Sequence, residues 1–183
     1  MKIIVDNVVK DSIADELGIK KGDEILSVNK KVPKDIIEYS YLINEELVEL
    51  LVKKTNNELE EFEIEKDYFE DLGIIFTNAV FDSIKKCHNH CIFCFVDQQP
   101  KGLRDSLYVK DDDWRLSYIQ GTYITLTNLS ESDFNRIEKY HISPLFVSIH
   151  TTNPKLRVEM TRNPKAGLIL DQLERFKKNK IQI

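Results

Sequence analysis

The most chemically distinctive feature of this 183-residue chain is a group of three cysteines in one short segment. Cys87, Cys91 and Cys94 follow the spacing C-x3-C-x2-C, and the sequence contains no other cysteine. An iron-sulfur cluster of the cubane type is normally held by four thiolates. Because this chain offers only three, such a cluster would keep one iron without a protein ligand. An open metal position is typical of a site that binds a further molecule.

Zinc is the alternative occupant of the same cysteines. A structural Zn²⁺ takes four ligands in a tetrahedron, so a histidine would have to complete the set. Zinc modules usually pair their ligands across two separate knuckles, whereas these cysteines lie in one loop, which weakens the zinc interpretation. A ferredoxin-like electron carrier would need a fourth cysteine. The histidines available to a zinc site are His88, His90, His141 and His150.

Alternating strands and helices are predicted downstream of the cysteines. Residues 121–129 and 145–150 have the alternation and β-branched content of strands, and residues 130–140 and 154–160 have the pattern of helices. Strand, helix and strand in succession are typical of a parallel (β/α) barrel. Chemistry in such barrels lies at the carboxyl ends of the strands. The residues nominated by this rule are Thr127, Asn128, His150, Thr151 and Thr152.

Two irregular stretches separate the cysteines from the first of these strands. Residues 95–104 contain turn signals and no periodicity, which predicts a loop that wraps the metal site. Residues 110–113 carry three adjacent carboxylates, which point in different directions and cannot all ligate one metal. This run predicts the N-terminus of a helix, where the dipole favours acidic side chains. Arg115, directly after it, is a candidate partner for a cofactor carboxylate.

The first seventy residues are predicted to form a small β-rich domain with two short helices. Ser12 stands where an N-cap would open the first helix, and Gly18 ends it. Near the end of this region, alternation on both sides of Asn56 and Asn57 predicts a hairpin. The predicted strands are residues 2–5, 24–29, 46–53 and 59–66, and the predicted helices are residues 13–17 and 35–44.

A resemblance to PDZ domains enters with residues 12–14 and 18–29, which look like the central signature of that family. PDZ domains bind peptides by adding a strand to a sheet edge, so a peptide or protein C-terminus is an expected partner. The chain departs from the family at Lys30, where a glycine usually stands, and no carboxylate-binding loop precedes Ile3. Residues 72–76 resemble that loop and would supply it by circular permutation. The simpler alternative makes them a linker or a core strand.

A second resemblance covers nearly the whole chain. The cysteine spacing matches the signature of radical S-adenosylmethionine (radical SAM) enzymes. Residues 94–98, 110–113, 121–129 and 143–150 are similar to an uncharacterised bacterial family that fuses a PDZ-like domain to a radical-SAM core. The resemblance implies a 4Fe-4S cluster on the three cysteines, with S-adenosyl-L-methionine at the open iron. It also implies an oxidoreductase that cleaves this cofactor to a 5′-deoxyadenosyl radical and abstracts hydrogen from an unknown substrate.

The same resemblance nominates residues for the cofactor. Phe93 stands where the family has an aromatic side chain beside the adenine. Gly121 is what remains of a Gly-Gly-Glu-Pro run that binds the amino group of the cofactor in the wider superfamily. The residues expected to bind the cofactor are therefore Phe93, Gly121, Thr127, Asn128 and His150, and the metal ligands are Cys87, Cys91 and Cys94.

Composition and charge limit the partners. No apolar run approaches the roughly 18 residues of a membrane-spanning helix, and clustered cysteines in odd number are a poor plan for disulfides. A cytoplasmic location is therefore predicted. Residues 1–70 carry 10 Lys or Arg against 18 Asp or Glu, so this acidic region would repel nucleic acid. No membrane is expected as a partner, and a reductant such as ferredoxin or flavodoxin is implied.

The sequence thus predicts an α/β protein with two parts. Residues 1–70 would form a PDZ-like domain, and residues 71–183 would form the first units of a partial (β/α) barrel. Because barrels typically need about 200 residues or more, the chain is expected to be a fragment that is inactive by itself. The rival hypothesis is a peptide-binding scaffold in which the cysteines hold a structural zinc or iron-sulfur site.

Overall fold

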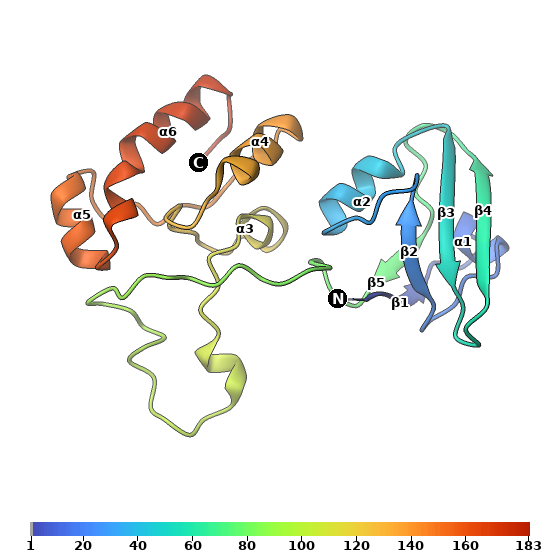
Figure 1. Ribbon diagram of the computed structural model, residues 1–183, viewed down its shortest axis with the longest axis horizontal. Coiled ribbons are helices and arrows are strands. Elements are labelled where there is room, and N and C mark those ends of the chain that lie inside the picture. Colours follow the sequence, from blue (N-terminus) through green and yellow to red (C-terminus); the bar gives the residue numbers. More distant parts are fainter. Residues whose placement is uncertain (1) are drawn as a thin grey trace. The chain divides into compact units, whose positions relative to one another are not determined.

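The computed structural model describes residues 2–183 and consists of two compact units that divide between Ser83 and Ile84 (Figure 1). The first unit is rich in strands and the second in helices. Among the described residues, no helix has the length and apolarity that crossing a membrane requires.

The first unit is built on a five-stranded sheet in the order β4-β3-β2-β1-β5, in which every neighbouring pair is antiparallel. Two short helices connect its strands. Its elements are β1 (Ile3–Val8), α1 (Ile13–Glu16), β2 (Glu24–Val28), α2 (Ile36–Leu42), β3 (Leu47–Lys53), β4 (Leu59–Glu65) and β5 (Ile74–Phe76).

The predicted hairpin is formed by β3 and β4, which pair continuously from Leu47 opposite Glu65 to Lys53 opposite Leu59. Apolar side chains alternate into the core from β3, and Ile64 buries itself on the partner strand. The glutamates that alternate with it on β4 are exposed. Period-two alternation therefore predicted this pair correctly, because one face is buried and the other meets water.

The predicted helix starts are confirmed as well. The Ser12 side chain accepts a hydrogen bond from the Asp15 amide at the start of α1, and Asp35 caps α2 in the same way through the Glu38 amide. Each cap satisfies a backbone donor that a helix leaves without an internal partner.

Residues 72–76 belong to this sheet and are not a linker. β5 pairs with β1, and the amides of Val9 and Ala14 donate to the carbonyls of Gly73 and Leu72. Gly73 has φ +82°, and a side-chain carbon there would lie 2.3 Å from Ser12. Glycine meets both demands, since it tolerates positive φ and close approach.

The second unit contains four α-helices and two short 3₁₀-helices among its described residues, and a long irregular stretch precedes α3 (Figure 1). The helices predicted over 130–140 and 154–160 are confirmed, and Ser130 with Asp133 forms a capping box. The elements are η1 (Asp105–Tyr108), α3 (Trp114–Gln120), α4 (Glu131–Lys139), α5 (Pro154–Thr161), η2 (Pro164–Leu168) and α6 (Ile169–Lys178).

The strands predicted over 121–129 and 145–150 do not form, and the structure does not show the barrel units. One parallel bridge, between Ile124 and Val147, joins the two segments. Side chains take the place of a neighbouring strand: the Thr125 amide donates to the Asp112 carboxylate, and the Phe146 amide donates to the Ser117 hydroxyl. These segments lie side by side, but their backbone groups are satisfied largely outside a ladder.

Candidate metal centre

The three cysteines line one open cavity of about 590 Å³ in the second unit. All three thiols are free and half-buried. The cavity wall is mostly apolar and comes from the cysteine loop, the stretch before α3 and the segments that precede α4 and α5. The other lining residues are Phe93, Phe95, Val96, Val109, Lys110, Asp111, Thr122, Tyr123, Thr125, Ser148 and His150.

Cys87 is positioned by pairing with the acidic run. The Cys87 amide donates to the Lys110 carbonyl at 2.8 Å, and the Asp112 amide donates to the Lys85 carbonyl at 2.9 Å. An antiparallel bridge joins the intervening residues, Lys86 and Asp111. The residues just before the first cysteine are therefore fixed to one wall of the cavity.

Cys91 is positioned from the other side, by the C-terminal end of α5. The amides of His90 and Ile92 donate to the carbonyls of Thr161 and Met160, each at 3.0 Å. These carbonyls lie in the last turn of α5, where helices leave acceptors without internal partners. A turn closed by the Cys94 amide on the Cys91 carbonyl, at 3.1 Å, brings the third thiol back toward the second.

The environment of Cys87 and Cys91 favours their protonated form in the absence of a bound cation. Burial raises the pKa of Cys87 and of Cys91, and the neighbouring Cys94 adds to the rise at Cys91. Lys110 donates to the Asp97 carboxylate at 2.8 Å. Burial opposes the charge of Lys110, but the bond to Asp97 and the nearby thiols raise its pKa overall. Thiols of this kind stay protonated unless a positive group stabilises their thiolate form.

The arrangement of the donors fits a cluster. In the part of the chain that the structure describes, no three His, Cys, Asp or Glu side chains converge as the ligands of a single ion would. The three thiols instead face a common cavity from its wall. A cubane cluster is bound at separate irons by separate thiolates, so donors spread around one cavity suit it.

Two of the residues predicted to bind the cofactor also line this cavity. The rings of Phe93 and His150 lie with their centroids 4.9 Å apart and tilted by 58°. Burial, and then the charge of Arg157, lower the pKa of His150, so its imidazole stays neutral at neutral pH. His150 is the one histidine of the four that lines the cavity described here.

The remaining three predicted residues do not line the cavity. Gly121 is the left-handed C-cap of α3, with φ +73°. Thr127 is buried and its hydroxyl donates to the Asn89 side chain at 3.0 Å. The Asn128 amide group donates to the carbonyls of Lys86 and Asp112. Each supports the segments around the cavity.

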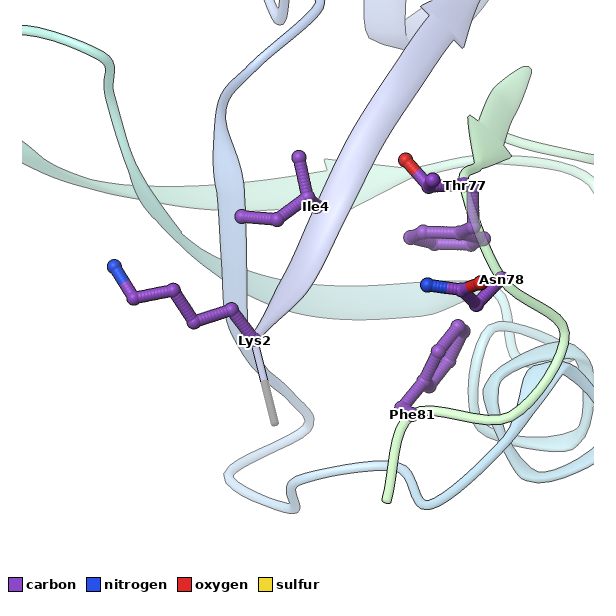
Figure 2. Close-up of a pocket in the computed structure, with 6 residues that line it drawn as sticks. Lys2, Ile4, Thr77, Asn78 and Phe81 are labelled. Atoms are coloured by element: carbon purple, nitrogen blue, oxygen red, sulfur yellow. The ribbon is translucent and has the colours of Figure 1, made fainter. Parts of the chain in front are cut away.

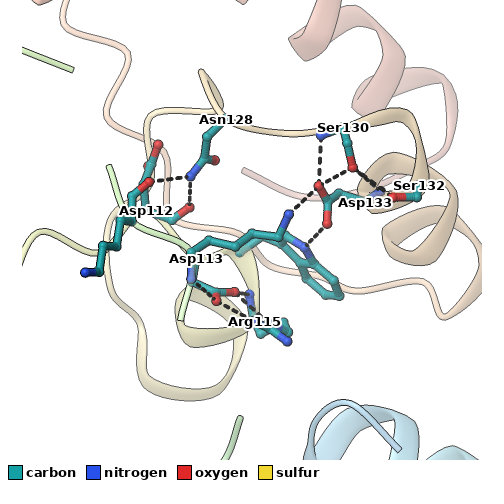
Figure 3. A network of polar contacts seen from close by, with 10 residues as sticks. Asp112, Asp113, Arg115, Asn128, Ser130, Ser132 and Asp133 are labelled. Atoms are coloured by element: carbon teal, nitrogen blue, oxygen red, sulfur yellow. Dashed lines mark hydrogen bonds and ion pairs between the residues drawn. The ribbon is translucent and has the colours of Figure 1, made fainter. Parts of the chain in front are cut away.

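The acidic run is confirmed as a helix start, because Asp113 is the N-cap of α3. Figure 3 shows that two residues of this run have different partners: Asp112 lies near Asn128, and Asp113 faces Arg115. The Arg115 guanidinium bonds both oxygens of Asp113, at 2.9 and 2.7 Å, and is 2% exposed. The idea that Arg115 binds a cofactor carboxylate is therefore corrected, since a carboxylate of the chain already occupies it.

Two polar groups of the cavity wall were missed by sequence reasoning. The Asp111 Oδ2 and Thr122 Oγ1 atoms are buried and have no hydrogen-bond partner among the described residues. Buried polar atoms without partners are uncommon and call for a ligand or water. The acidic run drew attention to Asp111, but no pattern in the sequence singles out Thr122.

The first unit has a smaller cavity, of about 250 Å³ (Figure 2). It lies between the start of β1, at Lys2 and Ile4, and the residues that end and follow β5. Phe76 and Phe81 meet there edge to face at 4.9 Å. This cavity lies at the end of β5 opposite to Gly73, so it is separate from the loop that resembles a carboxylate-binding loop.

The fold and the cysteine cavity together define a two-part protein, in which a small β-sheet unit precedes a helical unit with a thiol-lined cavity. A family model described as a Radical SAM-like domain matches residues 66–183, and the chain belongs to this family. A PDZ domain model matches residues 4–54. A search of curated proteins found no match.

These matches confirm both resemblances that the sequence motifs indicated. The radical SAM family match and the compact second unit begin at different residues, 66 and 84. The domain boundary predicted at residue 70 therefore stays a prediction.

Proposed function

We propose that the second unit is the iron-sulfur core of a radical SAM enzyme, with Cys87, Cys91 and Cys94 as ligands of a 4Fe-4S cluster. The position of the three cysteines in the wall of one cavity carries this proposal, together with the family match. When bound, the cluster would supply one electron to S-adenosyl-L-methionine, whose sulfur–C5′ bond would break to give methionine and a 5′-deoxyadenosyl radical that abstracts hydrogen from an unknown substrate.

The cavity wall offers groups suited to the parts of that cofactor. Phe93 and His150 present rings on which an adenine can stack. Asp111 Oδ2 and Thr122 Oγ1 are buried acceptors without a partner, which suits an ammonium group. They would take the place of the Gly-Gly-Glu-Pro run, which binds this amino group in the wider superfamily and of which only Gly121 remains here. The contacts of Gly121, Thr127 and Asn128 support the segments around the cavity, and their assignment as cofactor ligands stays a prediction.

Lys110 contributes charge to the site. It lines the cavity, and its ammonium group donates to the Asn89 carbonyl at 3.1 Å and to Asp97. A cation held beside three thiolates offsets part of their mutual repulsion. Lys110 would therefore favour the deprotonated thiols that metal binding requires.

The wider setting follows from the same family. The parallel bridge between Ile124 and Val147 supports a partial (β/α) barrel. A reductant such as ferredoxin or flavodoxin would deliver the electron, and the cytoplasm would be the location in which thiols stay reduced.

Metal analysis tests the cluster. Anaerobically purified protein should be brown and hold about four irons per chain, because thiolates around one cavity suit a cubane. Replacing Cys87, Cys91 or Cys94 by Ala should abolish iron binding. Val96→Ala changes the same cavity without removing a thiol, so it should keep its iron. Unchanged iron in the cysteine variants would exclude them as ligands, and one zinc per chain would favour the scaffold hypothesis.

A second experiment tests the open iron. Adding S-adenosyl-L-methionine should perturb the paramagnetic resonance spectrum of the reduced cluster, because three thiolates leave one metal position open. His150→Ala should respond in the same way, and His141→Ala, at an exposed position after α4, serves as the control that does not line the cavity. A spectrum that responds only after the loss of His150 would mean that this histidine closes the cluster. The radical mechanism would then have to be abandoned.

We also propose that the first unit binds an extended peptide at β5, one of the two outer strands of its sheet. Ile75 on this strand is 44% exposed. The Asp71 carboxylate already accepts the Gly73 amide at 2.6 Å, within the loop that resembles a carboxylate-binding loop. A free peptide carboxylate would be repelled there. Asp71→Asn should therefore strengthen the binding of free-carboxylate peptides over amidated ones in a fluorescence anisotropy series, and an equal effect on both would contradict this.

A further inference from the structure

Arg157 is a buried cation without an ion-pair partner among the described residues. It lies on α5, is 0% exposed, and donates every hydrogen bond to backbone carbonyls. Burying a charge is costly unless opposite charge or many hydrogen bonds compensate it. Its acceptors are Ile149 at 2.8 Å, Ala166 at 2.9 Å, Thr125 at 2.8 Å and Ser148 at 3.1 Å.

These acceptors connect Arg157 to the cysteine cavity. Two of them, Thr125 and Ser148, line it. The same helix receives the cysteine loop at its other end, through the carbonyls of Met160 and Thr161. The Thr161 hydroxyl in turn donates to the Arg157 carbonyl at 2.8 Å. Residues of α5 therefore bond to two walls of the cavity, and the Arg157 guanidinium fixes one of them through its hydrogen bonds.

We infer that Arg157 is a positioning residue for the cluster and that its buried charge raises the reduction potential of that cluster. This inference rests on the proposed function, because it requires a cluster on the three cysteines. No sequence pattern marked Arg157, since an isolated arginine on a short helix reads as a surface cation.

The physical reason is the charge balance of the site. Reduction adds one electron to a cluster already ligated by three thiolates, so the reduced state is the more negative one. A fixed cation in the low-dielectric interior stabilises that added charge more than an exposed cation would, because water does not screen it. Burial lowers the pKa of Arg157, and the charges of the Asp112 carboxylate and of a Cys91 thiolate oppose that effect. A reduced cluster would add a further and larger negative charge.

The test compares midpoint reduction potentials in anaerobic titrations followed by paramagnetic resonance. Arg157→Gln should lower the potential of the cluster, and Arg157→Lys, which keeps the charge, should recover most of the wild-type value. Arg162→Gln removes the same charge at the exposed C-cap of α5 and should leave the potential unchanged. Iron content and thermal unfolding are measured for each variant.

The outcomes separate the inference from the proposed function. Iron retained by Arg157→Lys but lost by Arg157→Gln would support the requirement for charge. Equal potentials in wild type, Arg157→Gln and Arg157→Lys would overturn the inference, as would equal loss of iron in both variants, which marks a purely structural clamp. A wild-type chain that takes up no iron would overturn the proposed function and this inference with it.

Discussion

The two units of this protein differ in the interactions that stabilise each of them internally. The first buries a continuous apolar core that lies on a regular sheet, and the charged residues buried in it are Asp23 and Asp35. The second buries nine polar or charged side chains among its described residues. They are Asn89, Asp112, Asp113, Arg115, Ser117, Thr127, Asp133, Arg157 and Thr161.

The difference follows from what each unit has to position. A ladder of strands satisfies its own backbone groups, so side chains are left to fill the core. The segments around the cysteine cavity make few ladder bonds and depend on side chains such as Asp112 and Arg157 for their backbone partners. Buried networks of this kind fix a unique geometry, but they are costly when one member is lost. The stability of the second unit should therefore respond most to the loss of a buried charge, and that of the first unit to the loss of buried apolar volume.

The largest effect is expected from Asp113→Ala. It removes the Asp113 carboxylate that bonds the 2% exposed Arg115, and breaking a buried ion pair costs about 3–5 kcal/mol. Urea unfolding measures the loss of stability, and hydrogen exchange should show reduced protection only in residues 84–183. Asp105→Ala removes an exposed carboxylate of the same unit and should stay within about 0.5 kcal/mol. Equal losses in the two variants would remove the contrast between the units.

The double variant Asp113→Leu with Arg115→Met sharpens this prediction. Replacing both partners of a buried pair by apolar residues is often nearly neutral, because no charge is left unpaired. The double variant should therefore be more stable than Asp113→Ala. It still loses the cap of α3 and the bond from the Lys85 amide, so a loss of about 1 kcal/mol relative to wild type is expected.

In the first unit the matching change is Leu50→Ala. Leu50 is 0% exposed on β3, and removing a buried leucine side chain costs about 2–5 kcal/mol, with the cavity that remains setting the value. Leu59→Ala on the neighbouring strand is the control, since Leu59 is 63% exposed and should change stability by less than about 0.5 kcal/mol. A small loss for Leu50→Ala would show that the core of this unit repacks.

Sequence reasoning succeeded where structure is local. The β3–β4 hairpin, the Ser12 cap and the helix that Ser130 begins were predictable because alternation and capping act within a few residues. The cysteine spacing led to the family, and its ligation role stays a prediction.

Failures came where partners are distant in the chain. Residues 121–129 have a strand-like pattern, but Leu126 has φ +62° and the Thr125 amide bonds the Asp112 side chain. Neither property is visible in a periodicity. Arg157 and Thr122 were missed for a related reason, because a residue's role in a cavity depends on segments that only the fold brings together.

Acid should destabilise the second unit before the first. Burial opposes ionisation of Asp113 and Asp133, but bonds from Arg115 and Lys85 outweigh it and hold both pKa values below the usual range. A lowered folded-state pKa contributes stability that is present above the unfolded value, about 3.9, and is lost as the pH falls through the folded one. Hydrogen exchange between pH 5 and pH 2 should show residues 84–183 losing protection first.

The first unit supplies the internal comparison for that titration. In that unit the pKa of the Asp23 carboxyl is lowered, because burial is outweighed by bonds from the Lys20 amide, Lys54 and the Thr55 amide. A Lys54→Met variant should bring the acid transition of this unit closer to the unfolded pKa of aspartate. Simultaneous loss of protection in both units of the wild-type chain would contradict the expected order.

The smallest effect is expected when the same chemical change is made at two helix caps. Ser12→Ala and Ser130→Ala each remove a hydroxyl that accepts an amide at 3.3 Å, which typically costs about 1 kcal/mol. The Ser130 hydroxyl also donates to Asp133, which accepts the Trp114 indole and the Lys85 ammonium group (Figure 3). The cap bond of Ser12 is exposed, at the start of a helix of four residues, and its acceptor hydroxyl is not bonded to a buried carboxylate among the described residues.

Ser130→Ala should therefore reduce stability more than Ser12→Ala does, by a few tenths of a kcal/mol or more, because the cap in the second unit belongs to a buried polar network. Urea unfolding of both variants in one buffer gives the difference. Ser130→Thr keeps the hydroxyl and should restore most of the loss. If the two alanine variants were equally destabilised, the cap would act independently of Asp133. The dependence of the second unit on connected polar groups would then not extend beyond the surroundings of the cysteines.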